Sequence, residues 1–203
     1  MKTLALGLAA AVTSASPAAL AQTATDTPAA DAQDSHPPAD TRPIRARRPF
    51  AIAGEVGWNG LAGLGANFSY HPLPQLALDA GAGLGLAGWK GGLRVRANLL
   101  TSAWSPVIGA GFLYQSGSAG EAVELQSEGD SAKLEVLGSS YAQLVAGVNY
   151  TGDEGFVFMA TTGYAILFGE NTRFVSGSRA VYDDVRPLLG SGLVLSASLG
   201  YAF

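Results

Sequence analysis

The sequence contains no cysteine, only two histidines and few charged residues, which make up 14% of the chain. Without cysteine an exported chain forms no disulfides, so its stability must come from backbone pairing and packing. The scarcity of cysteine and histidine leaves no cluster of the kind that binds zinc, and we predict neither a metal nor a cofactor. The mild net charge of −4 offers no basic surface to a nucleic acid.

Long apolar runs are also missing. No segment has about twenty consecutive apolar residues, which excludes membrane-spanning helices. Yet 48% of the chain is hydrophobic and glycine occurs 27 times. The hydrophobic residues must therefore be distributed over many short segments.

The chain begins like a protein destined for export. Lys2 supplies a positive start, residues 4–12 are apolar, and residues 19–21 form a small-residue A-x-A site. This order is typical of a secretory signal, so we predict a cleaved signal peptide over residues 1–21. The apolar run is too short to serve as a membrane anchor.

Residues 22–49 are rich in Ala, Asp, Thr and Pro and have almost no large apolar side chains. Such a segment cannot bury enough surface to order itself, which predicts a flexible periplasmic tether. Its end carries four arginines, Arg42, Arg45, Arg47 and Arg48. These would either contact anionic lipid headgroups at the periplasmic face or remain solvated.

From residue 50 to residue 203 apolar side chains recur at every second position, which is the pattern of β-strands. The runs are 50–58, 64–70, 76–86, 93–99, 108–114, 143–150, 156–166 and 193–203. Most have roughly the length that a tilted strand needs to cross the hydrocarbon layer. An even number of strands closes antiparallel without a free edge, which a bilayer requires. We therefore predict an all-β fold, an eight-stranded antiparallel transmembrane β-barrel over residues 50–203.

The two faces of these runs differ in a way that favours a membrane barrel. One face carries large apolar residues, while the other carries Gly, Ala, Ser, Asn and a few charges. A soluble sandwich would place its large residues inward and Lys, Glu and Thr outward. The small face fits the crowded interior of a narrow barrel, and a soluble lipocalin-like barrel is the alternative.

The last residues strengthen this interpretation. Leu199, Tyr201 and Phe203 alternate up to a terminal aromatic residue. With the layout of the runs, this ending resembles the small eight-stranded outer-membrane barrels of the OmpA, OmpX and OmpW kind. The resemblance implies a bacterial outer-membrane location, contact with outer-membrane lipids including lipopolysaccharide, and recognition of these three residues by the barrel-assembly machinery.

Charged and amide side chains on the small face form our first candidate site. They are Glu55, Asp79, Arg94, Arg96, Asn67 and Asn98. A tight turn at residues 88–89 would place Gly81 opposite Arg96, so that Arg96 reaches Glu55 over glycines. We predict one internal charge network, which would either gate a narrow pore or only fill a plugged core.

The connections predict a second candidate site. Short periplasmic turns are expected at 71–75, 101–104 and 151–155, tight outer turns near 59–60 and 88–89, and long outer loops over 115–140 and 168–190. The first long loop suggests a hairpin around residues 128–130, and the second suggests a ribbon through residues 174–175 and 181–182. The candidate interaction residues are Glu124, Asp130, Arg173 and Arg179. They would bind a surface partner or lipopolysaccharide phosphates, or remain solvated.

An enzyme is disfavoured, because serine-type chemistry needs a histidine near the nucleophile. His36 lies in the tether and His71 is expected on a periplasmic turn, so neither reaches the outer surface. We therefore expect a non-enzymatic outer-membrane barrel for envelope integrity or surface interaction. The alternatives are a narrow channel for ions or small solutes and, more remotely, a lipid-modifying enzyme.

Overall fold

The computed structural model describes residues 40–85, 88–118, 120–127 and 130–203. The predicted signal peptide and most of the predicted tether lie outside these residues. In the described part of the chain, no helix is long and apolar enough to cross a membrane.

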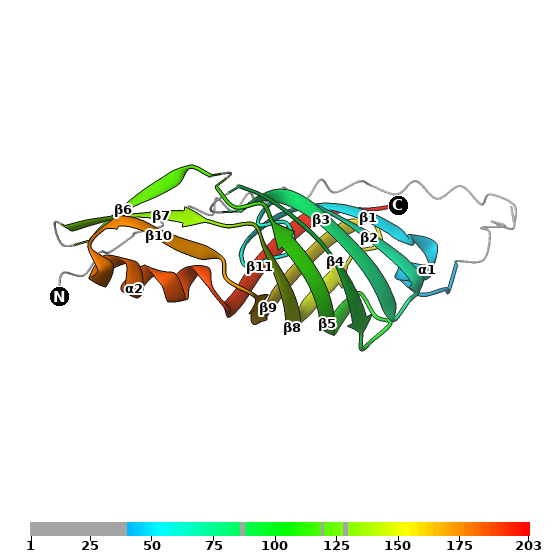
Figure 1. The fold of residues 1–203 in the computed structure, drawn as a ribbon. Helices are drawn as coiled ribbons and strands as arrows, with labels where there is room; N and C mark the ends of the chain where they lie inside the picture. The colour runs from blue at the N-terminus through cyan, green and yellow to red at the C-terminus, as the bar shows by residue number, and fades with distance from the viewer. Residues whose placement is uncertain (1–39, 86–87, 119, 128–129) are drawn as a thin grey trace, which may run out of the picture. The chain divides into compact units, whose positions relative to one another are not determined.

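Eight strands form one closed barrel, in the order β1-β11-β9-β8-β5-β4-β3-β2 (Figure 1). They are β1 (Phe50–Trp58), β2 (Leu64–Leu73), β3 (Leu76–Gly85), β4 (Gly88–Asn98), β5 (Trp104–Gln115), β8 (Ser139–Thr151), β9 (Phe156–Phe168) and β11 (Gly192–Ala202). Every neighbouring pair is antiparallel, and β1 closes the barrel by pairing with β11. The predicted fold class is confirmed.

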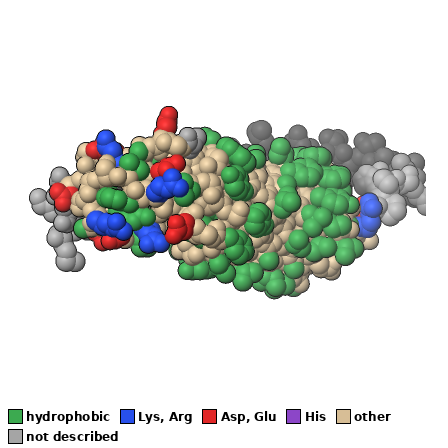
Figure 2. All heavy atoms as spheres, viewed as in Figure 1, with side chains coloured by type: hydrophobic (Ala, Val, Ile, Leu, Met, Phe, Trp, Pro, Cys, Tyr) green, Lys and Arg blue, Asp and Glu red, His purple; other side chains and the backbone are tan. Residues whose placement is uncertain are grey.

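The outer wall of the barrel is apolar. Large aliphatic side chains on it are mostly exposed, including Leu93 at 67% and Leu144 at 62%. Figure 2 shows hydrophobic side chains covering the visible barrel wall, with Lys, Arg, Asp and Glu gathered near the ends. A soluble monomer rarely exposes so large a continuous apolar surface. The protein is therefore a membrane-spanning barrel of the outer-membrane type.

Aromatic residues lie at both ends of this apolar wall. At one end the rings of Phe50 and Tyr70 are 5.1 Å apart, and those of Trp104 and Tyr150 are 4.8 Å apart. At the other end Trp89 packs against Tyr114 at 5.4 Å. Rings in two such belts are the usual interfacial girdles of a membrane barrel.

One end of the barrel carries an additional folded part, which we call the module. It contains β6 (Ala122–Ser127), β7 (Asp130–Val136), β10 (Thr172–Gly177) and the helix α2 (Arg179–Leu189). The strands form a sheet in the order β10-β7-β6, separate from the barrel. We call this end of the barrel the module end and the opposite end, near Phe203, the short-turn end.

The module confirms one predicted loop structure and corrects another. β6 and β7 form the hairpin expected in the first long loop, and two of its three predicted turn residues, 128–129, lie outside the described residues. The predicted ribbon in the second loop is correct only in its first half: Phe174 and Val175 lie in the strand β10, whereas Val181 and Tyr182 lie in α2. Residues 181, 182, 185 and 189 have helical spacing, and Val181 and Tyr182 pack on Leu134 of β7.

Two shorter connections also differ from the prediction. Gly88 and Trp89 belong to β4, which begins at Gly88, whereas residues 86–87 lie outside the described part of the chain. His71 lies inside β2 rather than on a turn. Both differences move a strand end by two or more residues, which changes the side chains that face each other across the sheet.

We predict that Leu93→Arg, at the middle of β4 on the lipid face, lowers the free energy of unfolding by about 2–4 kcal/mol. Urea titration of the protein refolded in phospholipid vesicles measures this change. Val123→Arg on the module is the control and should have little effect, because Val123 lies outside the membrane-spanning strands. Equal losses in both variants would contradict the assigned membrane region.

Candidate functional site

Asp79 is the centre of the polar lumen. It lies on β3 with its side chain fully buried, between Ser69 of β2 and Arg94 of β4, which are its direct partners across the sheet. Nε of Arg94 donates to Oδ2 of Asp79 at 3.0 Å, and Oγ of Ser69 donates to Oδ1 at 2.7 Å. Arg96 makes two further bonds, from Nε to Oδ2 and from Nη2 to Oδ1, each 3.0 Å long. One carboxylate therefore holds two buried guanidinium groups.

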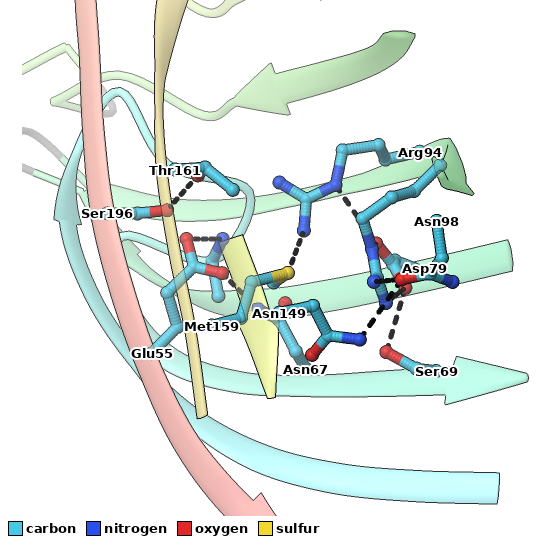
Figure 3. A network of polar contacts seen from close by, with 12 residues as sticks. Glu55, Asn67, Ser69, Asp79, Arg94, Asn98, Asn149, Met159, Thr161 and Ser196 are labelled. Carbon is cyan, nitrogen blue, oxygen red and sulfur yellow. Dashed lines mark hydrogen bonds and ion pairs between the residues drawn. The ribbon is translucent and has the colours of Figure 1, made fainter. Parts of the chain in front are cut away.

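Amide side chains extend this network across the lumen (Figure 3). Nη1 of Arg96 donates to Oδ1 of Asn98 at 3.0 Å, and Nδ2 of Asn149 on β8 donates to the same oxygen at 3.1 Å. On the other side, Nη2 of Arg94 lies 3.9 Å from Sδ of Met159 on β9. Side chains from five strands thus meet in the middle of a barrel that is just wide enough for side chains to fill.

Glu55 belongs to a separate cluster. Its carboxylate accepts a hydrogen bond from Nδ2 of Asn67 and another, 3.2 Å long, from the backbone N–H of Ala62. Ala62 and Leu61 lie in the connection between β1 and β2, and both are completely buried. This connection, residues 59–63, therefore folds into the lumen, and Glu55 holds it there.

The predicted contact between Glu55 and Arg96 is not made, because β3 and β4 pair in a different register. Asp79 faces Arg94 instead of Asn98, and Arg96 faces Ala77 instead of Gly81. Other parts of the predicted register are confirmed: Gly65 faces Glu55, and β5 places Gly109 opposite Arg96 and Gly111 opposite Arg94. The structure thus brings four of the six predicted residues together around Asp79 and leaves Glu55 with Asn67.

The short-turn end is closed by Arg45. This residue lies in a short helix, α1 (Ile44–Arg47), and is completely buried. Its guanidinium donates to the carbonyl oxygens of Leu100 and Ser102 at 3.2 and 3.1 Å, and to that of Ala103 at 3.1 Å. Burial lowers the pKa of Arg45 to about 10, with the charge of Arg96 adding to the effect, so the group remains protonated at neutral pH.

The other arginines of this segment also contact protein groups. Arg47 pairs with Asp153 at 2.6 Å, and Arg48 donates to the carbonyl oxygen of Ala202 at 2.9 Å. Arg42 pairs with Asp40, and this hydrogen-bonded pair holds the pKa of the Asp40 carboxyl near 2. Residues 44–49 therefore belong to the barrel rather than to the tether, a contribution that their sequence did not indicate.

Apolar side chains fill the lumen toward the module end. Leu113 of β5, Tyr141 and Val145 of β8, Ala165 of β9 and Val194 of β11 form one buried cluster. Together with the Asp79 network and the connection 59–63, this cluster fills much of the lumen.

The predicted outer residues lie on the module without forming one site. Arg173 of β10 pairs with Glu135 of β7 at 3.4 Å, and Glu124 of β6 lies 3.7 Å from Lys133. The guanidinium of Arg179 lies over the ring of Phe174 at 5.4 Å. Asp130 is exposed at the start of β7. The three residues of the predicted assembly signal, Leu199, Tyr201 and Phe203, all expose their side chains on the outer wall or its end.

The described part of the chain contains no group of three His, Cys, Asp or Glu side chains that is able to hold a metal ion. His71 is buried in the lumen, and neither of its ring nitrogens has a hydrogen-bond partner among the described residues. Its place on β2, near the turn to β3, is far from the module.

Comparisons with known proteins found a likeness in structure but none in sequence. No family model matches the chain, and no curated protein sequence matches it. Among solved structures, the crystal structure of Acinetobacter baumannii CarO is similar, with a TM-score of 0.41 and 13% sequence identity. The match covers 77% of this chain and 98% of that chain. A likeness this distant identifies no shared function and no shared residue roles.

We predict that Asp79→Asn destabilises the barrel by about 3–5 kcal/mol, because two buried arginines lose their counter-charge. Asp153→Asn is the matched control: it breaks a pair at the protein surface and should cost less than about 1 kcal/mol. Urea titration of both variants against the parent protein measures the difference. Similar losses in the two variants would show that the Asp79 pairs are not the main support of the lumen.

Proposed function

We propose that this outer-membrane barrel, exported through a cleaved signal peptide, is a non-conducting and non-catalytic scaffold that presents the module at the cell surface. The observation that carries the proposal is the closed lumen. The barrel strands supply the wall, while the functional surface belongs to the connections between β5 and β8 and between β9 and β11.

Three obstacles along the lumen support a closed barrel. Arg45 covers the short-turn end by binding three backbone carbonyl groups of the β4–β5 turn. The Asp79 network crosses the middle, and Leu61 and Leu113 are fully buried toward the module end. The charges that we considered as a gate are thus bound to one another rather than free to coordinate a passing ion.

The construction of the module supports a role in surface interaction. α2 packs on the sheet through a buried core that includes Leu134, Val136 and Tyr182, so the module is a folded unit and not a loose loop. β6 is an edge strand of this sheet, and its residues Val123 and Glu124 are exposed. An exposed edge offers backbone groups for an additional strand, so we propose an extended segment of a partner protein as the ligand of β6.

A narrow channel is the second candidate, and unpartnered polar atoms inside the barrel favour it. Both amide atoms of Gln143 and Nη1 of Arg94 are buried without a hydrogen-bond partner among the described residues. Buried polar groups of this kind are usually hydrated, which would give the lumen a water path. Conductance separates the two functions.

We predict that the refolded full chain gives no discrete openings in a planar bilayer. The variant Asp79→Ala, Arg94→Ala, Arg96→Ala removes only the central obstacle, so it should stay silent while Arg45 and the Leu113 cluster remain, as should the module variant Arg173→Ala. Heat-sensitive gel mobility establishes that each sample is folded. Openings in the parent protein that change in size when Arg96 alone is replaced would reject the closed scaffold in favour of the channel.

A further inference from the structure

The module end of the lumen contains a cavity of about 550 Å³. Residues of β1, β2, β3, β4, β5 and β8 line it, and Val136, Asn171 and Leu189 of the module complete it. Its volume lies within the range of about 300–1,000 Å³ that is usual for small-molecule sites. Nothing in the proposed scaffold function uses this space.

Lys90 is the charged side chain that lines this cavity. It lies on β4 with 3% of its surface exposed, and within the described residues it makes no hydrogen bond and no ion pair shorter than 4.0 Å. Its Nζ is not among the buried polar atoms that lack a partner in the described residues, so the ammonium reaches the cavity, where an anion can pair with it.

The row of residues around Lys90 explains the missing partner, because the first two residues across the sheet carry no side chain. The residue opposite Lys90 on β3 is Gly83, and the next residue in the row, on β2, is Gly65. The first carboxylate in this direction is that of Glu55, which is already bound by Asn67 and Ala62. On the other side Lys90 faces Gln115, whose amide also lines the cavity.

Apolar residues on the module side complete the lining. Val136 of β7, Tyr141 of β8 and Leu189 of α2 all border the cavity. Val56, Leu64 and Leu84 border it as well, but their side chains are 62%, 65% and 61% exposed on the outer wall and point to the lipid side. The cavity therefore combines an ammonium group with apolar side chains of β8 and the module.

We propose that this cavity binds a single-chain anionic amphiphile, a molecule with one carboxylate or phosphate head and an alkyl tail. The head pairs with Lys90 and accepts a hydrogen bond from the amide of Gln115. The tail lies against Val136, Tyr141 and Leu189, where burial of apolar surface favours it. A cationic amphiphile is excluded by the charge of Lys90. Binding at this site does not depend on whether the barrel conducts, so the proposal is independent of the proposed scaffold function.

Native mass spectrometry of the full chain in a nonionic detergent tests the proposal with dodecanoate as the probe. We expect one dodecanoate per protein, and a loss of affinity on the order of tenfold or more in Lys90→Gln, because a charge-assisted hydrogen bond is removed. Lys133→Gln is the matched control. It removes an exposed lysine of the module and should leave binding unchanged.

A second variant tests the space independently of the charge. A side chain at Gly85 would extend toward the flexible end of Gln115, 3.0 Å from the new Cβ, so Gly85→Val fills the cavity without meeting backbone. We expect this variant to fold and to bind dodecanoate less tightly than the parent protein. Heat-sensitive gel mobility confirms the fold of each sample.

Three further probes complete the experiment. Dodecyltrimethylammonium and acetate should not bind, because the first has the wrong charge and the second has no tail. Dodecyl phosphate should bind at the same site: tighter binding than that of dodecanoate would indicate a lipid phosphate as the natural head, and weaker binding a fatty acid. Equal retention of dodecanoate by the parent protein and Lys90→Gln, or binding of acetate as tight as that of dodecanoate, would overturn the proposal.

Discussion

The structure depends on one constraint, that every backbone N–H and C=O inside a bilayer must be hydrogen-bonded within the protein. The pair β1–β11 meets it by removing the last free sheet edge, with register running from Ala51–Ala202 to Trp58–Leu195. Closure with only eight strands then leaves an interior as narrow as the side chains that fill it. The small face of each strand, the buried charges and the inward connection 59–63 all follow from this narrowness.

The polar filling of the lumen follows the same logic at the level of single residues. Arg94 and Arg96 fit because Gly109 and Gly111 stand opposite them on β5 and leave room for long side chains. Two guanidinium groups in so confined a space need an anion, and Asp79 supplies it from the adjoining strand. Arg45 shows a second solution at the short-turn end, where neutral carbonyl oxygens of a turn replace the carboxylate.

The sequence predicts the barrel well, because alternation is decisive wherever large and small residues take opposite faces. It fails between β3 and β4, where Gly81, Gly83 and Gly85 face Gly92, Lys90 and Gly88. Glycine on the lumen face leaves this end of the strand pair with few side chains that could select one register over another, so alternation alone does not predict it. The sequence does not predict α2, because a short apolar pair such as 181–182 fits a strand as well as a helix. α1 is a single turn, too short for any periodic signal.

The sequence alone could have placed Lys90 in the lumen. It lies an even number of residues from Arg94 and Arg96 on one strand, so the three side chains share a face. The three cations differ in the residues that face them from the adjacent strand. β3 presents Asp79 to Arg94 and, through it, to Arg96, but it presents Gly83 to Lys90. A Cβ at position 83 would lie 2.5 Å from the carbonyl oxygen of Leu64 and 2.6 Å from that of Ala62, so no carboxylate can stand opposite Lys90. The close approach of the β2 backbone therefore requires glycine there, and the anion that pairs with Lys90 has to come from the cavity at the module end.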